Sequence, residues 1–92
     1  MSEEAKIEAY LNTLVKRSNG HSRKLSYIGR RGCPDRLIML NNGVYFVEVK
    51  AAKGVVSVHQ EREMELLKSF GAEVLLLNSK AAVKKFIDRV IG

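Results

Sequence analysis

Apolar residues recur along the chain with two different spacings, and this pattern predicts both helices and strands. The first segment carries apolar residues at the three- and four-residue steps of a single helical face: Ile7, Leu11, Leu14 and Val15. Ser2 precedes the segment as a candidate N-cap, and two glutamates follow it in the first turn. We therefore expect an amphipathic helix at the start of the chain.

Three short strands are predicted next, over residues 23–28, 36–40 and 44–50. The second and third strands flank Asn42-Gly43, and this dipeptide is the strongest short-range signal for a two-residue hairpin loop. Counting back through that antiparallel register places Asp35 opposite Lys50 and diagonal to Glu48. The hairpin is therefore expected to bring two acids and a lysine together.

The second half of the chain predicts a helix, a strand and a final helix. Ser57 and Gln60 form a capping box for a helix that ends near Phe70, with Gly71 as its stop. Residues 72–77 form a run that is apolar apart from Glu73 and is typical of a buried strand. After Asn78-Ser79, apolar residues return to helical spacing: Val83, Phe86, Ile87, Val90 and Ile91. A strand, helix and strand in this order imply a right-handed parallel crossover.

Length and composition agree with a single α/β domain that covers residues 1–92. A chain of 92 residues allows a modest core and leaves much surface that a partner subunit would help to bury. The one cysteine, Cys33, excludes an internal disulfide, and we expect it to be a buried, inert thiol. No signal peptide and no membrane-spanning apolar run occurs, so we expect a soluble, cytoplasmic protein without a membrane partner.

Several function classes lack their motifs. The chain has no GxxxxGK[ST] loop, no CxxC pair and no convincing Ser-His-Asp order. ATP hydrolysis, zinc binding and acyl transfer are therefore without support, and no nucleotide cofactor is expected.

The excess of positive charge lies in one segment. The net charge is +6, and between Lys16 and Arg36 seven basic residues stand against one acid. Glycines flank Arg30-Arg31, so the backbone there can approach a ligand closely. This pattern favours binding of a nucleic-acid backbone over a merely solvated loop. The candidate contacts, including one from the stretch 51–56, are Arg23, Lys24, Arg30, Arg31, Arg36 and Lys53.

Asp35, Glu48 and Lys50 are the candidate reactive groups. Two carboxylates suit Mg²⁺ or Mn²⁺, and the carbonyl of Val49 is a plausible further ligand. A bound cation activates water and neutralises charge on a phosphate, while the lysine orients the nucleophile. The competing interpretation is a solvated hairpin face. The strand is apolar on both faces, however, which predicts burial and makes unpaired charges costly there; its apolar residues are Val44, Tyr45, Phe46, Val47 and Val49.

Two further residues have alternative interpretations. Glu8 lies at the edge of the first helix's apolar stripe, where an acid must face something polar such as a metal site. Glu4 lies near the same face and is the alternative acid, although its first-turn position is explained by the helix dipole. Gln60 is either a capping residue or an active-site residue, and the two roles are compatible.

The order Glu8, Gly32-x-Pro34-Asp35, Glu48-x-Lys50 and Ser57-x-x-Gln60 resembles the PD-(D/E)xK nuclease superfamily and, within it, the VRR-NUC family. The resemblance implies an αβββαβ restriction-endonuclease-like core, with a mixed sheet flanked by helices and a C-terminal helix added. It also implies roles for six residues. The metal-binding acids are Asp35 and Glu48, the main-chain ligand Val49, the catalytic lysine Lys50, the active-site glutamine Gln60 and the first-helix acid Glu8.

The same resemblance implies a Mg²⁺- or Mn²⁺-dependent DNA endonuclease of phage or bacterial type. Compact members of the family act as homodimers that resemble Holliday-junction resolvases, so branched DNA and a second copy of the chain are the expected partners. Flaps, nicked duplex and plain duplex are alternative substrates. A non-catalytic, basic DNA-binding module is the alternative function.

Overall fold

The computed structural model describes residues 1–92 as three helices and one four-stranded sheet. The order helix, three strands, helix, strand, helix is the predicted one. The elements are α1 (Glu3–Arg17), β1 (His21–Lys24), β2 (Arg36–Leu40), β3 (Gly43–Val49), α2 (Val58–Ser69), β4 (Glu73–Leu77) and α3 (Lys80–Ile91).

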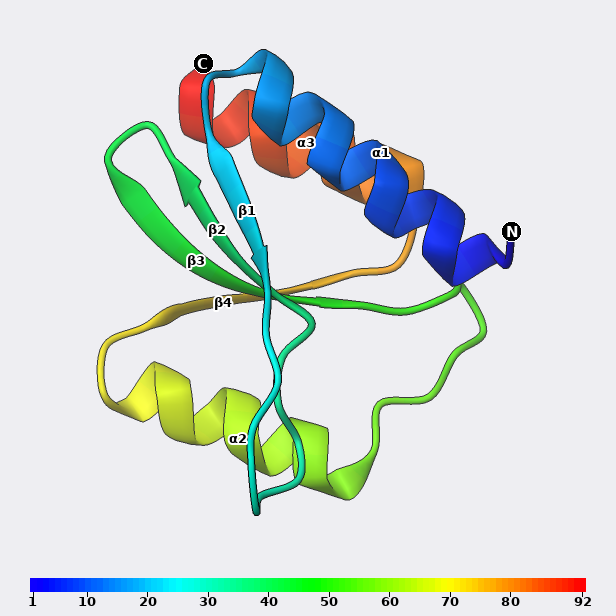
Figure 1. Cartoon of the computed structure of the whole chain (residues 1–92), viewed down its shortest axis with the longest axis vertical. Coiled ribbons are helices and arrows are strands. Elements are labelled where there is room, and N and C mark those ends of the chain that lie inside the picture. Colours follow the sequence, from blue (N-terminus) through cyan, green and yellow to red (C-terminus); the bar gives the residue numbers. More distant parts are fainter.

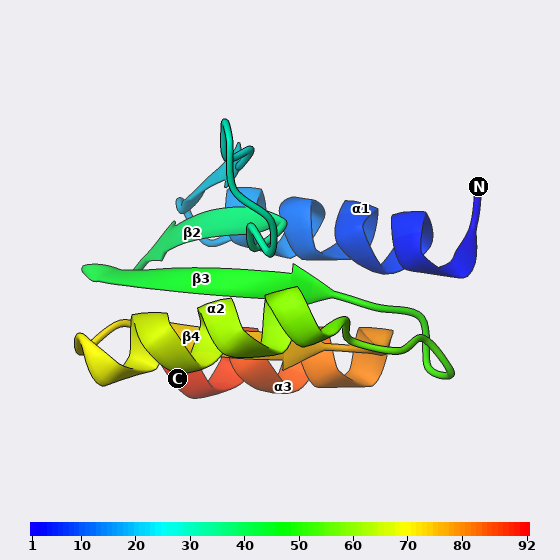
Figure 2. The same cartoon turned by 90° about the horizontal axis from the view of Figure 1, so that it is seen from below.

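The sheet has the strand order β1-β2-β3-β4 and is mixed. Neighbouring strands from β1 to β3 are antiparallel, whereas β3 and β4 are parallel and are joined through α2. Figure 1 shows α1 and α3 side by side on one side of the sheet and α2 on the other. Figure 2 shows β2 and β3 between α1 and α2. The predicted α/β class and parallel crossover are therefore confirmed.

Serine caps begin all three helices, as the sequence predicts. The Ser2 hydroxyl accepts a hydrogen bond from the Ala5 N–H at 3.1 Å, and the Ser79 hydroxyl accepts one from the Ala82 N–H at 3.0 Å. Ser57 begins α2 within a complete capping box. Such caps satisfy N–H groups that the helix itself leaves free, so short helices begin at defined residues.

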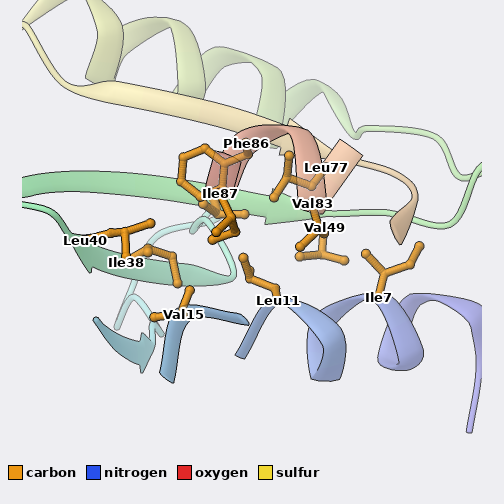
Figure 3. Close-up of a cluster of buried hydrophobic side chains, with 11 residues drawn as sticks. Ile7, Leu11, Val15, Ile38, Leu40, Val49, Leu77, Val83, Phe86 and Ile87 are labelled. Atoms are coloured by element: carbon orange, nitrogen blue, oxygen red, sulfur yellow. The ribbon is translucent and has the colours of Figure 1, made fainter. Parts of the chain in front are cut away.

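The hydrophobic core lies between the sheet and the pair α1 and α3 (Figure 3). It contains Ile7, Leu11, Val15, Ile38, Leu40, Val47, Val49, Leu77, Val83, Phe86 and Ile87. On α2, by contrast, the only buried side chain is a glutamate. The opposite side of the sheet is therefore thinly covered. None of the three helices has the length and apolar character needed to cross a membrane.

The first strand differs from the predicted range 23–28. It spans His21–Lys24, and its last contact with the next strand is the Leu25 N–H donating to the Asp35 carbonyl at 3.1 Å. Beyond this contact the chain leaves the sheet, and Ile28 is fully exposed. The apolar residues after Lys24 resemble a strand in sequence, but contacts with α2, described below, hold them outside the sheet.

The β2–β3 turn consists of Asn41-Asn42, so the predicted Asn42-Gly43 loop is wrong. Both asparagines have positive φ, 48° and 66°, as a two-residue type I′ turn requires. Gly43 is instead the first residue of β3 and pairs with Leu40. A Cβ at Gly43 would lie 2.5 Å from the Tyr45 hydroxyl, so packing rather than the turn requires glycine there.

This turn moves the hairpin register by two residues. Arg36 faces Val47, and one step further along the same register Asp35 faces Glu48. The predicted pairing of Asp35 with Lys50 is therefore wrong. Because side chains alternate with a period of two, a shift of two residues leaves each side chain on its predicted face. The ends of β3 and β4 differ from prediction by one residue only.

Candidate metal and nucleic-acid site

Two carboxylates meet at the open end of the β2–β3 hairpin. Asp35 comes directly before β2, and Glu48 lies in β3 at the facing position. The Asp35 Oδ2 atom accepts a hydrogen bond of 2.7 Å from the Val49 N–H. This contact fixes the aspartate against the strand that carries the glutamate.

The Glu48 carboxylate is buried without a partner. Its residue is 1% exposed, and neither of its oxygens accepts a hydrogen bond within the chain. Burial, followed by the neighbouring Asp35 carboxylate, raises the pKa of Glu48 to about 8, and the Lys50 ammonium partly opposes this shift. The competing interpretation of a solvated hairpin face is therefore wrong for Glu48. An uncompensated buried carboxylate requires a proton or a cation.

The donors at this position suit a hard divalent cation. Mg²⁺ commonly takes one or two carboxylates and keeps several waters, and Asp35 and Glu48 provide two carboxylates. In a strand the N–H and C=O of one residue point to the same edge. Because the Val49 N–H points to Asp35, its carbonyl is directed to the same side. No group of three or more His, Cys, Asp or Glu side chains is gathered anywhere in the structure.

Lys50 directly follows β3, two residues after Glu48 and on the same face. Its N–H donates to the Leu77 carbonyl at 3.1 Å, which continues the parallel pairing with β4 past the end of the strand. The side chain is partly exposed. Lys50 therefore has a fixed backbone next to Glu48 and an ammonium that a ligand can reach.

Glu8 is paired with basic residues rather than grouped with the two acids. Its Oε2 atom accepts a hydrogen bond of 2.7 Å from the Arg36 Nε and lies 3.5 Å from the Lys24 Nζ. Arg36 follows Asp35 in sequence, but consecutive side chains along a strand point to opposite faces of the sheet, so this ion pair does not join the two carboxylates. Glu3, in the first turn of α1, accepts a 2.6 Å hydrogen bond from the Ala52 N–H. This bond ties the segment after Lys50 to α1.

Gln60 participates in the capping box. Its Oε1 atom accepts a hydrogen bond from the Ser57 N–H at 3.0 Å, and its own N–H donates to the Ser57 hydroxyl at 3.1 Å. The capping interpretation is therefore confirmed. The side-chain nitrogen is the part of Gln60 that remains for a ligand, and the active-site role stays a prediction.

A basic groove of about 450 Å³ lies between α1 and β1. Its charged lining residues are Lys16, Arg23 and Arg36, and no acid lines it. Arg36 is held in place by Glu8 and by a longer contact of 3.5 Å to the Ser22 hydroxyl. The groove therefore offers positive charge of the kind that binds phosphates, with Arg36 in a fixed position.

The remaining candidate DNA contacts lie outside this groove. Lys24 is paired with Glu8 but its side chain is 63% exposed. Arg31 and Lys53 are exposed, and Arg30 binds Glu63 on α2. The structure thus divides the predicted basic residues between the groove, the end of β1, the β1–β2 segment and the loop after Lys50.

Glu63 is a buried acid that the sequence analysis missed. It is 5% exposed and accepts hydrogen bonds from the Tyr27 hydroxyl at 2.7 Å and from the Arg30 Nε and Nη2 at 3.2 and 3.0 Å. The bond from Tyr27, and after it the contacts with Arg30, lower the pKa of Glu63, while burial and Glu63 raise the pKa of Tyr27 to about 12. Its only sequence signal is its position one turn after Gln60.

Cys33 is half-buried, which is less than predicted. Its thiol donates to the Pro34 carbonyl at 3.2 Å. Burial is the main cause that raises the pKa of the Cys33 thiol, and the carboxylates of Glu48, Asp35 and Glu63 add to it. A thiol kept protonated in this way is a poor nucleophile.

Gly32 is expected to be essential for the packing of the β1–β2 segment on α2. Its φ is +90°, and a Cβ there would lie 2.4 Å from the His59 carbonyl oxygen. Gly32→Ala should lower the free energy of unfolding by about 3 kcal/mol or more, because positive-φ strain and a backbone clash act together.

Gly29→Ala is the matched control for this prediction. Gly29 also has positive φ, +74°, but a Cβ there meets nothing within 4 Å. Gly29→Ala should lower the free energy of unfolding by only about 1 kcal/mol. Urea unfolding of both variants measures the difference, and equal losses of stability would contradict the proposed packing.

Comparisons with known proteins relate the chain to a curated protein and to solved structures. No family profile matches the chain. A protein named "Putative nuclease p44", from Acyrthosiphon pisum secondary endosymbiont phage 1, is 40% identical over 78 residues, and the match covers 84% of each chain. Among solved structures, one described as a VRR_NUC domain superposes with a TM-score of 0.89 and 36% identity, covering 96% of this chain and 97% of the other.

Proposed function

The chain belongs to the VRR_NUC family of nuclease domains, and from this premise we propose that it is a Mg²⁺- or Mn²⁺-dependent DNA endonuclease. Asp35 and Glu48, with the Val49 carbonyl, hold the cation, and Lys50 acts on the attacking water. The observation that carries the proposal is the buried Glu48 carboxylate, which has no partner in the chain and lies beside a second carboxylate. A nuclease active site explains why that unfavourable arrangement is kept.

When bound, the cation lowers the pKa of a water molecule and neutralises charge that develops on the phosphate. The other contributions come from the chain's own residues. Lys50 holds a proton at Nζ and directs a hydrogen bond to the attacking water or to a phosphate oxygen. Asp35 is kept in one orientation by the Val49 N–H, so its free oxygen needs no reorganisation when a ligand arrives.

Glu8 and Gln60 support the site rather than react. Glu8 holds Arg36 in the basic groove through a 2.7 Å hydrogen bond, which fixes the position of the arginine at the start of β2. Gln60 has its oxygen in the capping box, so we assign its amide nitrogen to the substrate. DNA follows the basic residues: Lys16, Arg23, Lys24, Arg30, Arg31, Arg36 and Lys53.

The proposed substrate is branched DNA, and the proposed assembly is a homodimer. Only 14 of 92 residues are buried, and apolar Leu66 and Leu76 stay 45% and 44% exposed on α2 and β4. β4 also has a free sheet edge, because β3 is its only neighbour. A second copy would cover this apolar surface and supply a second active site for a second strand. Sedimentation equilibrium tests the assembly, and a monomer at all concentrations would contradict it.

Cleavage of labelled DNA tests the substrate. We expect a synthetic four-way junction to be cut faster than a flap, nicked duplex or plain duplex in Mg²⁺ or Mn²⁺, with no cutting in EDTA. Equal rates on all four substrates would support a general nuclease instead. If the flap were cut fastest, the preferred substrate would be a flap and not a junction.

A further inference from the structure

The segment between β1 and β2 carries an apolar side chain at an unusual place. In Figure 1 this segment runs from the sheet past α2, and in Figure 2 it rises away from the body of the domain. Ile28 lies in it and is 101% exposed. Single exposed apolar residues are common on protein surfaces. Ile28 differs because the chain on both sides of it is held rigidly.

Glu63 is the residue that holds the chain on both sides of Ile28. One of its carboxylate oxygens accepts the hydrogen bond from Tyr27, directly before Ile28. The other accepts both hydrogen bonds from Arg30, two residues after it. Gly32 then packs so closely on α2 that no side chain fits. The Tyr27–Glu63–Arg30 clamp thus presents Ile28 on a fixed backbone, and its own side chain contributes nothing to the core.

The surroundings of Ile28 favour DNA as the molecule it contacts. Residues 25–34 contain two arginines and no acid. Arg30 uses two of its five N–H groups on Glu63, which leaves three for a phosphate, and its side chain is 60% exposed. Arg31 is exposed beside it. An apolar tip flanked by arginines matches DNA, in which stacked bases lie between two lines of phosphates.

We propose that Ile28 is a wedge that enters a base step of bound DNA, with Arg30 and Arg31 on the neighbouring phosphates. This inference rests on the proposed function, since it assigns part of the same DNA-binding surface. Apolar side chains inserted in this way partly unstack the bases, and the lost stacking is unfavourable. The cost is smallest where stacking is already interrupted, so the wedge favours branch points over plain duplex.

The test uses a four-way junction with 2-aminopurine beside the branch point, bound in EDTA so that no strand is cut. The wild-type protein should increase the fluorescence, because unstacked 2-aminopurine is brighter. Ile28→Ala should abolish the increase and weaken junction binding about tenfold, while plain duplex, where insertion is too costly, is bound within about twofold of wild type. Ile91→Ala, a truncation of an equally apolar residue that is 48% exposed on α3, should change neither reading.

A second variant separates the wedge from simple charge effects. Glu63→Gln removes a negative charge, which by electrostatics alone should tighten DNA binding. If the clamp positions Ile28, this variant should instead reduce the fluorescence increase and the preference for the junction. Glu61→Gln, at an exposed position two residues earlier in α2, controls for loss of charge.

Four outcomes would overturn the inference: no fluorescence change with wild type, an unchanged signal in Ile28→Ala, an equal loss of affinity for all DNA, or a change in oligomeric mass. The last would assign Ile28 to an interface between copies. Because the assay reads binding only, a protein that unstacks the junction but cuts nothing would keep the wedge and reject the nuclease. A protein that cuts the junction without unstacking it would support the nuclease and reject the wedge.

Discussion

Glu48→Gln is expected to abolish DNA cleavage and, in the absence of metal, to remove a pH dependence of stability. The pKa of Glu48 is raised to about 8 by burial and by Asp35. The folded protein therefore binds more protons than the unfolded chain between the ordinary carboxyl pKa and about 8, and the free energy of unfolding falls as pH rises through that window. The expected fall across this window is on the order of 5 kcal/mol in wild type.

Thermal unfolding in EDTA from pH 5 to pH 9 measures this effect. As pH rises, the melting temperature of wild type should fall more steeply than that of Glu48→Gln. When Mn²⁺ replaces EDTA at the alkaline end, the melting temperature should recover in wild type but not in the variant. Cleavage by the variant should drop by at least about a thousandfold. Glu61→Gln, which neutralises an exposed acid on α2, should follow wild type in every reading. Parallel melting curves for wild type and Glu48→Gln would show that Glu48 is not a buried titrating group.

Asp35→Asn should separate cleavage from binding. Asparagine retains an oxygen that accepts from the Val49 N–H, so the local structure should survive, but one negative ligand is lost. Single-turnover cleavage should fall at least about a thousandfold. DNA affinity, measured by fluorescence anisotropy in EDTA, should stay the same or rise, because a negative charge near the phosphate has gone.

Asp88→Asn is the control for this split, because Asp88 is an exposed acid on α3 paired with Lys84. It should leave both cleavage and binding unchanged. If Asp35→Asn weakened binding as much as cleavage, the aspartate would be structural. A wild-type protein that binds DNA and never cuts it would instead support the DNA-binding module.

The helices and the opposing acids are predictable because their signals are local. Ser2, Ser57 and Ser79 are each followed by a helix, and their hydroxyls accept the N–H three residues later. The meeting of Asp35 and Glu48 survives the wrong register, because a shift of two residues preserves the face of each side chain. The local pattern does not determine which dipeptide forms the turn, since Asn41 and Asn42 both tolerate positive φ and Gly43 is needed for packing against Tyr45.

The other features that prediction missed depend on contacts between residues that are distant in sequence. Tyr27 and Glu63 are 36 residues apart, and nothing near either one signals their hydrogen bond. The same contact ends β1 early, because it draws the following residues towards α2. The sequence places Glu8 near the metal, but its pairing with Arg36 depends on how α1 packs against the sheet. Such contacts follow from tertiary packing rather than from propensity.

The most direct test of the central claim is the single-turnover rate on the preferred DNA substrate for wild type and Lys50→Ala, in Mg²⁺, Mn²⁺ and EDTA. Lys68→Ala, an exposed lysine in the last turn of α2, is the control. We expect wild type and the control to cut only with metal, and Lys50→Ala to cut at least about a hundredfold more slowly with metal present. Tight binding by wild type without cutting in either metal would contradict the account.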